Sequence, residues 1–200
     1  SEQAIDTGAQ EERPDHDGAA DGRLLCIAGY DPMINLTTRS IGAALTALGA
    51  SPLYGKALDV SNPATLFCQA GVAGGARSAT GALKVLVNAG IAIPVSLTAG
   101  NRTSATMSLQ IVPSYDGTNA PLTLTAAQAL AGTPAADEVY YAGPGKLNNV
   151  AISSIKSLSI NFGITLDKSD HAGYPYYSFV CVKSIRPVIT ITTDAVDLAA

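Results

Sequence analysis

Two histidines, His16 and His171, are the side chains in this sequence best suited to acid–base catalysis near neutral pH. A hydrolytic triad needs such a base beside a nucleophile and an orienting carboxylate. His16 lies in an acidic segment, and His171 directly follows Asp170, so these two neighbours would point to opposite sides of an extended chain. We therefore interpret His171 as part of a solvated loop and expect the protein not to be an enzyme.

Metal and phosphate sites have equally little support. The histidines are far apart, and no two cysteines have the spacing of a zinc site. Acidic residues over 15–21 lie near glycines, but the segment lacks the bidentate glutamate and the spacing of a calcium loop. The glycine-rich run 71–77 lacks the Lys-Ser/Thr of a phosphate-binding loop, which favours a flexible connection. We expect no metal and no cofactor.

The three cysteines are odd in number, far apart and flanked by apolar residues. This pattern does not match a disulfide framework and is typical of structural thiols. We predict that Cys26, Cys68 and Cys181 are buried and reduced.

Tyrosines cluster at Tyr140-Tyr141 and at Tyr174-Pro175-Tyr176-Tyr177. A tyrosine combines a rigid ring with a polar tip, so the second cluster could form a contact surface for carbohydrate or protein. The alternative is that the rings pack on a sheet beside a turn, and we favour this packing interpretation.

Charge is distributed unevenly along the chain. Residues 1–22 hold one basic and seven acidic groups (1 − 7 = −6), whereas residues 23–200 hold eleven basic and nine acidic groups (11 − 9 = +2). The first segment shows no apolar periodicity, so we predict a mobile acidic arm over 1–22 and a single domain over 23–200. The scattered basic residues of the body form no groove for tight binding of nucleic acid.

The composition suggests a partly covered surface. Charged residues make up 14% of the chain and hydrophobic residues 47%, whereas soluble domains usually contain about 25% charged residues. We therefore expect neighbouring molecules to cover part of the surface. The longest apolar stretch, 83–97, is interrupted by Lys84 and Pro94 and falls short of the ~20 residues that span a bilayer, so no membrane contact is expected.

One amphipathic helix is predicted after Ser40, with Gly49 as its stop. Its apolar residues recur at i, i+3, i+4 and i+7: Ile41, Ala44, Leu45 and Leu48. A second candidate over 125–132 is short, and a turn is the alternative there.

Strict alternation predicts strands over much of the remaining chain. The clearest run has an apolar residue at every second position: Leu158, Ile160, Phe162, Ile164 and Leu166. Runs at 83–87, 91–97 and 107–111 alternate similarly, and a last pair covers 178–183 and 188–193, where Pro187 marks an edge, a bend or a strand start. These patterns predict a mainly β fold, a β-sandwich or open barrel with long hairpins and one flanking α-helix.

The C-terminal block has a distinctive order. A strand over 152–162 ends at Gly163, a polar loop contains Gly173-Tyr174-Pro175, an apolar stretch covers 180–182, and Arg186-Pro187 opens a Thr/Ile-rich strand. In this order the last quarter of the chain resembles the tail tube (major tail) proteins of long-tailed bacteriophages.

The resemblance implies a β-sandwich with a flanking helix that forms rings by strand pairing between subunits, so that an inner barrel surrounds a DNA channel. Rings would stack through arms and loops, and the acidic arm could dock on the next ring or add negative charge to a lumen that is expected to be negative in this family. The expected partners are other copies of this chain, other phage tail proteins and, transiently, DNA without sequence preference. The expected location is the virion tail, assembled in the host cytoplasm.

The residues expected to mediate assembly lie on two strand runs and one turn: Leu83, Val85, Val87, Leu158, Ile160, Phe162, Ile164, Leu166, Tyr174 and Pro175. Two other functions stay open as alternatives. One is a capsid decoration or turret protein, and the other is a carbohydrate-binding adhesin module that uses the loop 174–177.

Overall fold

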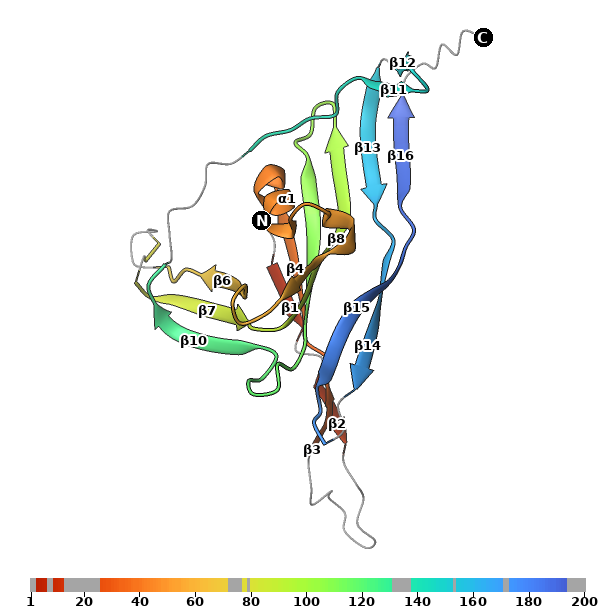
Figure 1. The fold of residues 1–200 in the computed structure, drawn as a ribbon. Helices are drawn as coiled ribbons and strands as arrows, with labels where there is room; N and C mark the ends of the chain where they lie inside the picture. Colours follow the sequence, from red (N-terminus) through yellow and green to blue (C-terminus); the bar gives the residue numbers. More distant parts are fainter. Residues whose placement is uncertain are drawn as a thin grey trace, which may run out of the picture.

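The computed structural model describes residues 3–6, 9–12, 26–71, 77–78, 80–130, 138–152, 154–170 and 173–193. As predicted, the protein is mainly β, with several antiparallel sheets and one α-helix (Figure 1). No sheet closes into a barrel within these residues.

The largest sheet has seven strands in the described part of the chain. Six of them follow one path, and every neighbouring pair on it is antiparallel. In spatial order they are β1 (Gln3–Asp6), β4 (Met33–Thr38), β9 (Thr106–Pro113), β8 (Gly90–Gly100), β13 (Ile155–Asn161) and β16 (Val188–Thr193). The seventh strand, β5 (Lys56–Leu58), pairs with the first residues of β8, and β13 pairs with the last ones.

Two short strands lie within residues 1–22, where the sequence did not predict any. β1 pairs with β4, and β2 (Ala9–Glu12) pairs with β3 (Cys26–Tyr30). Residues 13–25 lie outside the described part of the chain. The mobility of the acidic segment and the domain boundary at residue 22 therefore stay predictions.

The predicted helix is present as α1 (Ile41–Leu48), which packs on one face of the main sheet (Figure 1). Its buried side chains, Ile41, Ala44 and Leu48, form a core with Ala105, Met107 and Leu109. The backbone N–H of Gly49 ends the helix by donating to the carbonyl oxygens of Leu45 and Thr46. A 3-10 turn, η1 (Pro52–Tyr54), then leads to β5.

A smaller sheet covers the other end of this face. Its strands are β10 (Thr123–Gln128), β7 (Ala82–Val87) and β6 (Ala64–Cys68) in that order. Val85 and Val87 pack on Ile34 and Ile111 of the main sheet. The second helix candidate is therefore wrong over its described residues, because pairing with β7 places this alanine-rich segment in a strand.

The C-terminal hairpin bends in the middle, so the alternation over 158–166 does not form one strand. β13 is followed by β14 (Ile164–Asp170), and β15 (Tyr177–Ile185) is followed by β16. β13 pairs with β16 and β14 pairs with β15. The break falls at Gly163, with φ +56°, opposite Arg186.

Beyond the bend, β14 and β15 leave the main sheet and pack on the face opposite α1; this part of the hairpin lies below the bend in Figure 1. Val180 of β15 forms a buried cluster with Ile91, Ile93 and Val112, and Ile164 and Leu166 border this cluster. A β-bulge between Pro94 and Ser96 also interrupts β8, so the predicted single register over 91–97 changes face at Val95.

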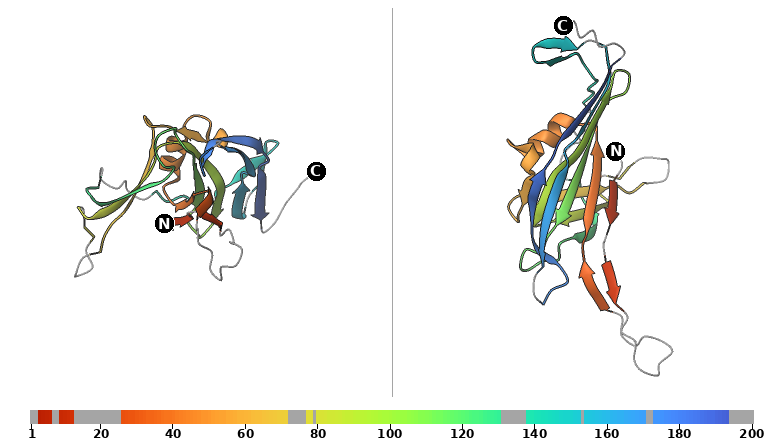
Figure 2. Two further views of the ribbon diagram at one scale, coloured as in Figure 1. Left: turned by 90° about the horizontal axis from the view of Figure 1, so that it is seen from below. Right: turned by 90° about the vertical axis from the view of Figure 1, so that its right-hand side faces the viewer.

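Two hairpins mark opposite ends of the molecule (Figures 1 and 2). The β2–β3 pair lies at one end. At the other end lies β11 (Gly145–Leu147) with β12 (Val150–Ile152), which turns at Asn148 and Asn149 with φ of +47° and +66°. The main sheet connects the two ends.

Candidate assembly surface

In the part of the main sheet that includes β13 and β16, above the bend in Figure 1, the two faces differ in chemistry. Cross-strand partners share a face. On one face, whose β16 edge also carries Val188 opposite Asn161, hydroxyl and amide side chains extend over five strands. We call this set the polar face: Asn35, Thr37, Ser96, Thr98, Thr106, Ser108, Gln110, Ser157, Ser159, Asn161, Thr190 and Thr192. None of these residues is charged.

Side chains on the polar face bond to one another across the strands. The hydroxyls of Thr98 and Thr106 are 2.9 Å apart, and those of Thr37 and Ser108 are 3.4 Å apart. Gln110 Nε2 donates to Asn35 Oδ1 at 3.2 Å. These bonds fix polar groups in place without ionised partners, so the face is wettable and carries no formal charge of its own.

The opposite face holds several of the predicted assembly residues. Leu158 pairs with Ile191, and Ile160 pairs with Ile189, so these four aliphatic side chains share one face. Phe162, two residues beyond Ile160, packs against the core cluster under α1. The structure therefore brings together the upper half of the predicted run, whereas Ile164 and Leu166 contact the cluster below the bend.

The predicted assembly residues of β7 lie mostly inside the subunit. Val85 and Val87 are each 1% exposed, whereas Leu83 is 36% exposed. Any effect of these two valines on assembly would pass through the core of the subunit.

The edge strand β16 is the feature that sequence reasoning did not select. Its side chains Val188, Ile189 and Ile191 are 60%, 62% and 43% exposed. β13 pairs with one side of β16, and no described strand pairs with the other side. Pro187, directly before it, was a signal for an edge strand.

The predicted turn residues Tyr174 and Pro175 lie at the lower end, in a cluster of tyrosines. The Tyr115 ring stacks on Tyr174 and Tyr176 with centroid distances of 4.7 and 5.7 Å. Tyr30 meets Tyr176 edge to face, and its backbone N–H donates to the Pro175 carbonyl oxygen at 2.7 Å. These contacts support the packing interpretation of the cluster.

Packing also changes the acidity of the cluster. Burial of the ring raises the pKa of Tyr30 above its ordinary value of 10.0, and Tyr176 adds to this shift. Desolvation, followed by hydrogen bonding to Tyr174, raises the pKa of Tyr115. Both shifts keep the phenols neutral, so they give no reactive phenolate near neutral pH.

An ion pair connects the C-terminal hairpin to the β3–β4 turn. Lys168 Nζ lies 2.6 and 2.5 Å from the two carboxylate oxygens of Asp31, and 5.0 Å from the centroid of the Tyr177 ring. The lysine and aspartate side chains are 24% and 28% exposed. This pair therefore joins two distant segments beside the tyrosine cluster.

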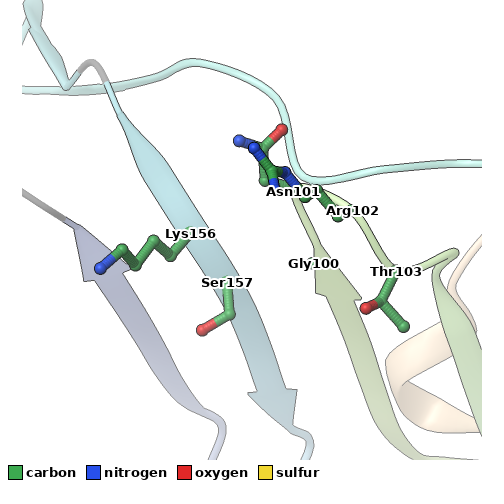
Figure 3. A pocket seen from close by; sticks show the side chains of 6 residues that line it. All are labelled: Gly100, Asn101, Arg102, Thr103, Lys156 and Ser157. Atoms are coloured by element: carbon green, nitrogen blue, oxygen red, sulfur yellow. The ribbon is translucent and has the colours of Figure 1, made fainter.

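An open pocket of about 450 Å³ lies at the upper end of the polar face (Figure 3). Its lining includes Arg102, from the turn between β8 and β9, and Lys156 of β13. Figure 3 shows Lys156 extending toward β16, away from Arg102. The two cations do not converge, so the pocket does not form an anion clamp.

The described residues hold no group of three or more His, Cys, Asp and Glu side chains placed to bind a metal ion. His16 and His171 lie outside those residues. Within the described ranges, two carboxylates with a lowered pKa stabilise turns: Asp59 accepts from the backbone N–H groups of Asn62 and Ser61, and Asp116 accepts from Asn119 and Thr118.

The prediction of a buried thiol is wrong for Cys68, which is exposed and free. It ends β6, the edge strand of the small sheet, where its side chain can face solvent. Cys181 is free and half-buried, and the side chain of Cys26 lies outside the described part of the structure.

Comparison with known proteins leaves the family of this chain open. No protein-family model matches the chain, and no curated protein is significantly similar to it in sequence. Among the described residues, no helix has the length and apolar character needed to cross a membrane.

Proposed function

We propose that the protein is a structural virion subunit that polymerises through its main sheet into stacked rings, forming a phage tail tube for DNA passage. The observation that carries this proposal is the exposed aliphatic edge at β16, formed by Val188, Ile189 and Ile191. Edge strands of monomers are usually shortened, charged or covered. An aliphatic edge without a charged residue suits a protein that another copy covers.

The polar face suits the lining of a channel. Lysine and arginine would bind DNA phosphates and slow its movement, and the polar face contains neither. It also lacks the carboxylates expected of a negative lumen. In this proposal the hydroxyl and amide groups of the polar face hold a layer of water, and DNA slides past a part of the wall that carries no formal charge.

The other partners follow from the same proposal. The two end hairpins, β2–β3 and β11–β12, lie where neighbouring rings would stack (Figure 2). Leu147 and Val150 in the upper hairpin are 66% and 51% exposed, which suits contact with a neighbouring ring or another tail protein. The subunit would assemble in the host cytoplasm and remain in the virion tail.

One observation favours the adhesin alternative. Tyr174 is 49% exposed and helps to line a polar pocket of about 390 Å³ with Asp31 and Asp170. However, Tyr174 and Tyr176 already stack on Tyr115, which occupies ring faces that a sugar would need. A decoration or turret protein would share the fold but would not polymerise by itself.

Sedimentation and electron microscopy of the purified full chain test the proposal. We expect rings or hollow filaments with a central channel at high protein concentration or with tail assembly partners. A strictly monomeric or trimeric species under all these conditions would contradict the tube and favour a decoration protein. Glycan binding that disappears in Tyr174→Ala would instead support the adhesin.

A further inference from the structure

The strands of the main sheet alternate in direction along the whole path from β1 to β16. Each of the five neighbouring pairs on this path is antiparallel. Because the path contains six strands, its two outermost strands run in opposite directions. β16 and β1 are these two strands, and within the described residues each is paired on one side only.

A ring adds a condition to this arrangement. Rotation about the ring axis keeps every subunit pointing the same way, and the strands of a closed barrel keep one common tilt to the axis. β16 of one copy would therefore meet β1 of the next copy in antiparallel orientation. Without β1 the outermost strand would be β4, which runs in the same direction as β16, and the junction would be parallel.

We propose that β1 is the closing strand of the ring and pairs antiparallel with β16 of the neighbouring copy. This inference rests on the proposed function and identifies the two strands at the subunit interface. It assigns the start of the acidic segment to lateral pairing within a ring, in addition to any contact between rings. Such a junction continues the antiparallel hydrogen-bonding pattern of the sheet. Antiparallel pairing is also slightly more stable per residue than parallel pairing.

The two faces of the sheet restrict the register of this junction. Position 4 is opposite Asn35 in the β1–β4 register and therefore lies on the side of the polar face. On β16, positions 188, 190 and 192 are opposite Asn161, Ser159 and Ser157 on that same side, whereas Ile189 and Ile191 lie on the other. Because a slip of one residue would exchange the faces, position 4 should meet an even-numbered position of β16.

A two-fold contact between two β16 strands is the competing arrangement. It would also be antiparallel and would cover the same aliphatic side chains, but it closes at a dimer and leaves both β1 strands unpaired. Rings need a head-to-tail contact between two different edges, so β16 and β1 are the pair that fits them.

Cysteine cross-linking of the assembled full chain tests the junction and its register. All variants carry Cys68→Ser, and the paired-cysteine variants also carry Ala4→Cys together with one further cysteine in β16. We expect cross-links between copies with one or more of Val188→Cys, Thr190→Cys and Thr192→Cys to exceed those with the matched controls Ile189→Cys and Ile191→Cys by about tenfold or more. Equal cross-linking on both faces, or no cross-link from position 4 above the Cys68→Ser background, would overturn the proposal. Strong dimer formation by Thr190→Cys without Ala4→Cys would support the β16–β16 contact instead.

Deletion of residues 1–6 gives an independent readout. We expect the shortened chain to keep its β-rich circular dichroism spectrum and cooperative melting but to lose rings under conditions where the full chain forms them. Rings of normal size from the shortened chain would show that β1 does not close the ring, while the proposed tube function would stand. Failure of the full chain to form rings would overturn both proposals.

Discussion

The backbone N–H of Arg186 donates a hydrogen bond of 3.1 Å to the carbonyl oxygen of Gly163, at the bend of the C-terminal hairpin. A Cβ atom at position 163 would lie 2.1 Å from the carbonyl oxygen of Arg186 and 2.8 Å from its carbonyl carbon. These neighbours are backbone atoms and cannot move aside by a change of rotamer. The close approach of the two strands therefore requires glycine at position 163.

We expect Gly163→Ala to reduce the free energy of unfolding by about 3 kcal/mol, because left-handed backbone alone costs an L-residue roughly 1–2 kcal/mol and the clash adds to this cost. Urea denaturation followed by circular dichroism measures the change. Gly173→Ala is the matched control, since Gly173 has φ +88° but no atom within 4 Å of its added Cβ. Equal losses in the two variants would contradict the role assigned to the Arg186 backbone.

The ion pair between Lys168 and Asp31 supports a second prediction. Both side chains are about three-quarters buried, so solvent screens the pair less than an exposed one. In a double-mutant cycle with Lys168→Met and Asp31→Asn, we expect a coupling free energy of about 1 kcal/mol. Lys183→Met, at an exposed position of the same hairpin, should change stability little. A coupling energy near zero at low salt would show that the pair does not fasten the hairpin.

The tyrosine cluster makes stability depend on alkaline pH. The folded pKa of Tyr30 lies above its unfolded value, mainly because of burial. The resulting stabilisation is complete below the unfolded pKa near 10 and is lost as pH rises through the folded pKa. We expect Tyr30→Phe to weaken this alkaline loss in urea midpoints measured between about pH 8 and pH 12. Tyr54→Phe, at a 69% exposed ring, is the control and should leave the pH profile of the native chain unchanged.

Local sequence patterns predicted the elements whose buried side chains recur at a regular spacing. The helical spacing identified Ile41, Ala44 and Leu48, which are all buried, and only Leu45 at the border of that face stays 37% exposed. Alternation at Met107 and Ile111 likewise identified a buried strand face. In both places the packing partner covers the element along its full length, so periodicity and burial agree.

The same patterns could not predict features that depend on contacts between distant segments. Gly163 interrupts a perfect alternation because Arg186 approaches it, and the bulge at Val95 changes the face of β8. The position of β16 at an edge depends on the order of the strands, which alternation does not encode. For this reason the sequence identified Leu158 and Ile160 but did not select Ile189 and Ile191, their partners across the strands.

The uncharged character of the polar face gives a prediction for the assembled tube. Thr98 lies exposed on this face, and its hydroxyl is 2.9 Å from that of Thr106. We expect Thr98→Lys to retain more DNA in assembled tubes and to steepen the salt dependence of retention by about 0.9 per phosphate neutralised in each subunit contact. Co-sedimentation of DNA with tubes at several salt concentrations measures both effects.

The matched control places the same charge on the other side of the sheet. Ala43 lies exposed on α1, which packs on the opposite face. Ala43→Lys changes the net charge of the subunit as Thr98→Lys does, so the two variants differ only in where the lysine stands. Because a lysine on the outside of a tube is far from DNA in its channel, we expect Ala43→Lys to retain DNA as the native chain does. Equal DNA retention by the two lysine variants would mean that the polar face does not line the channel, even if tubes form.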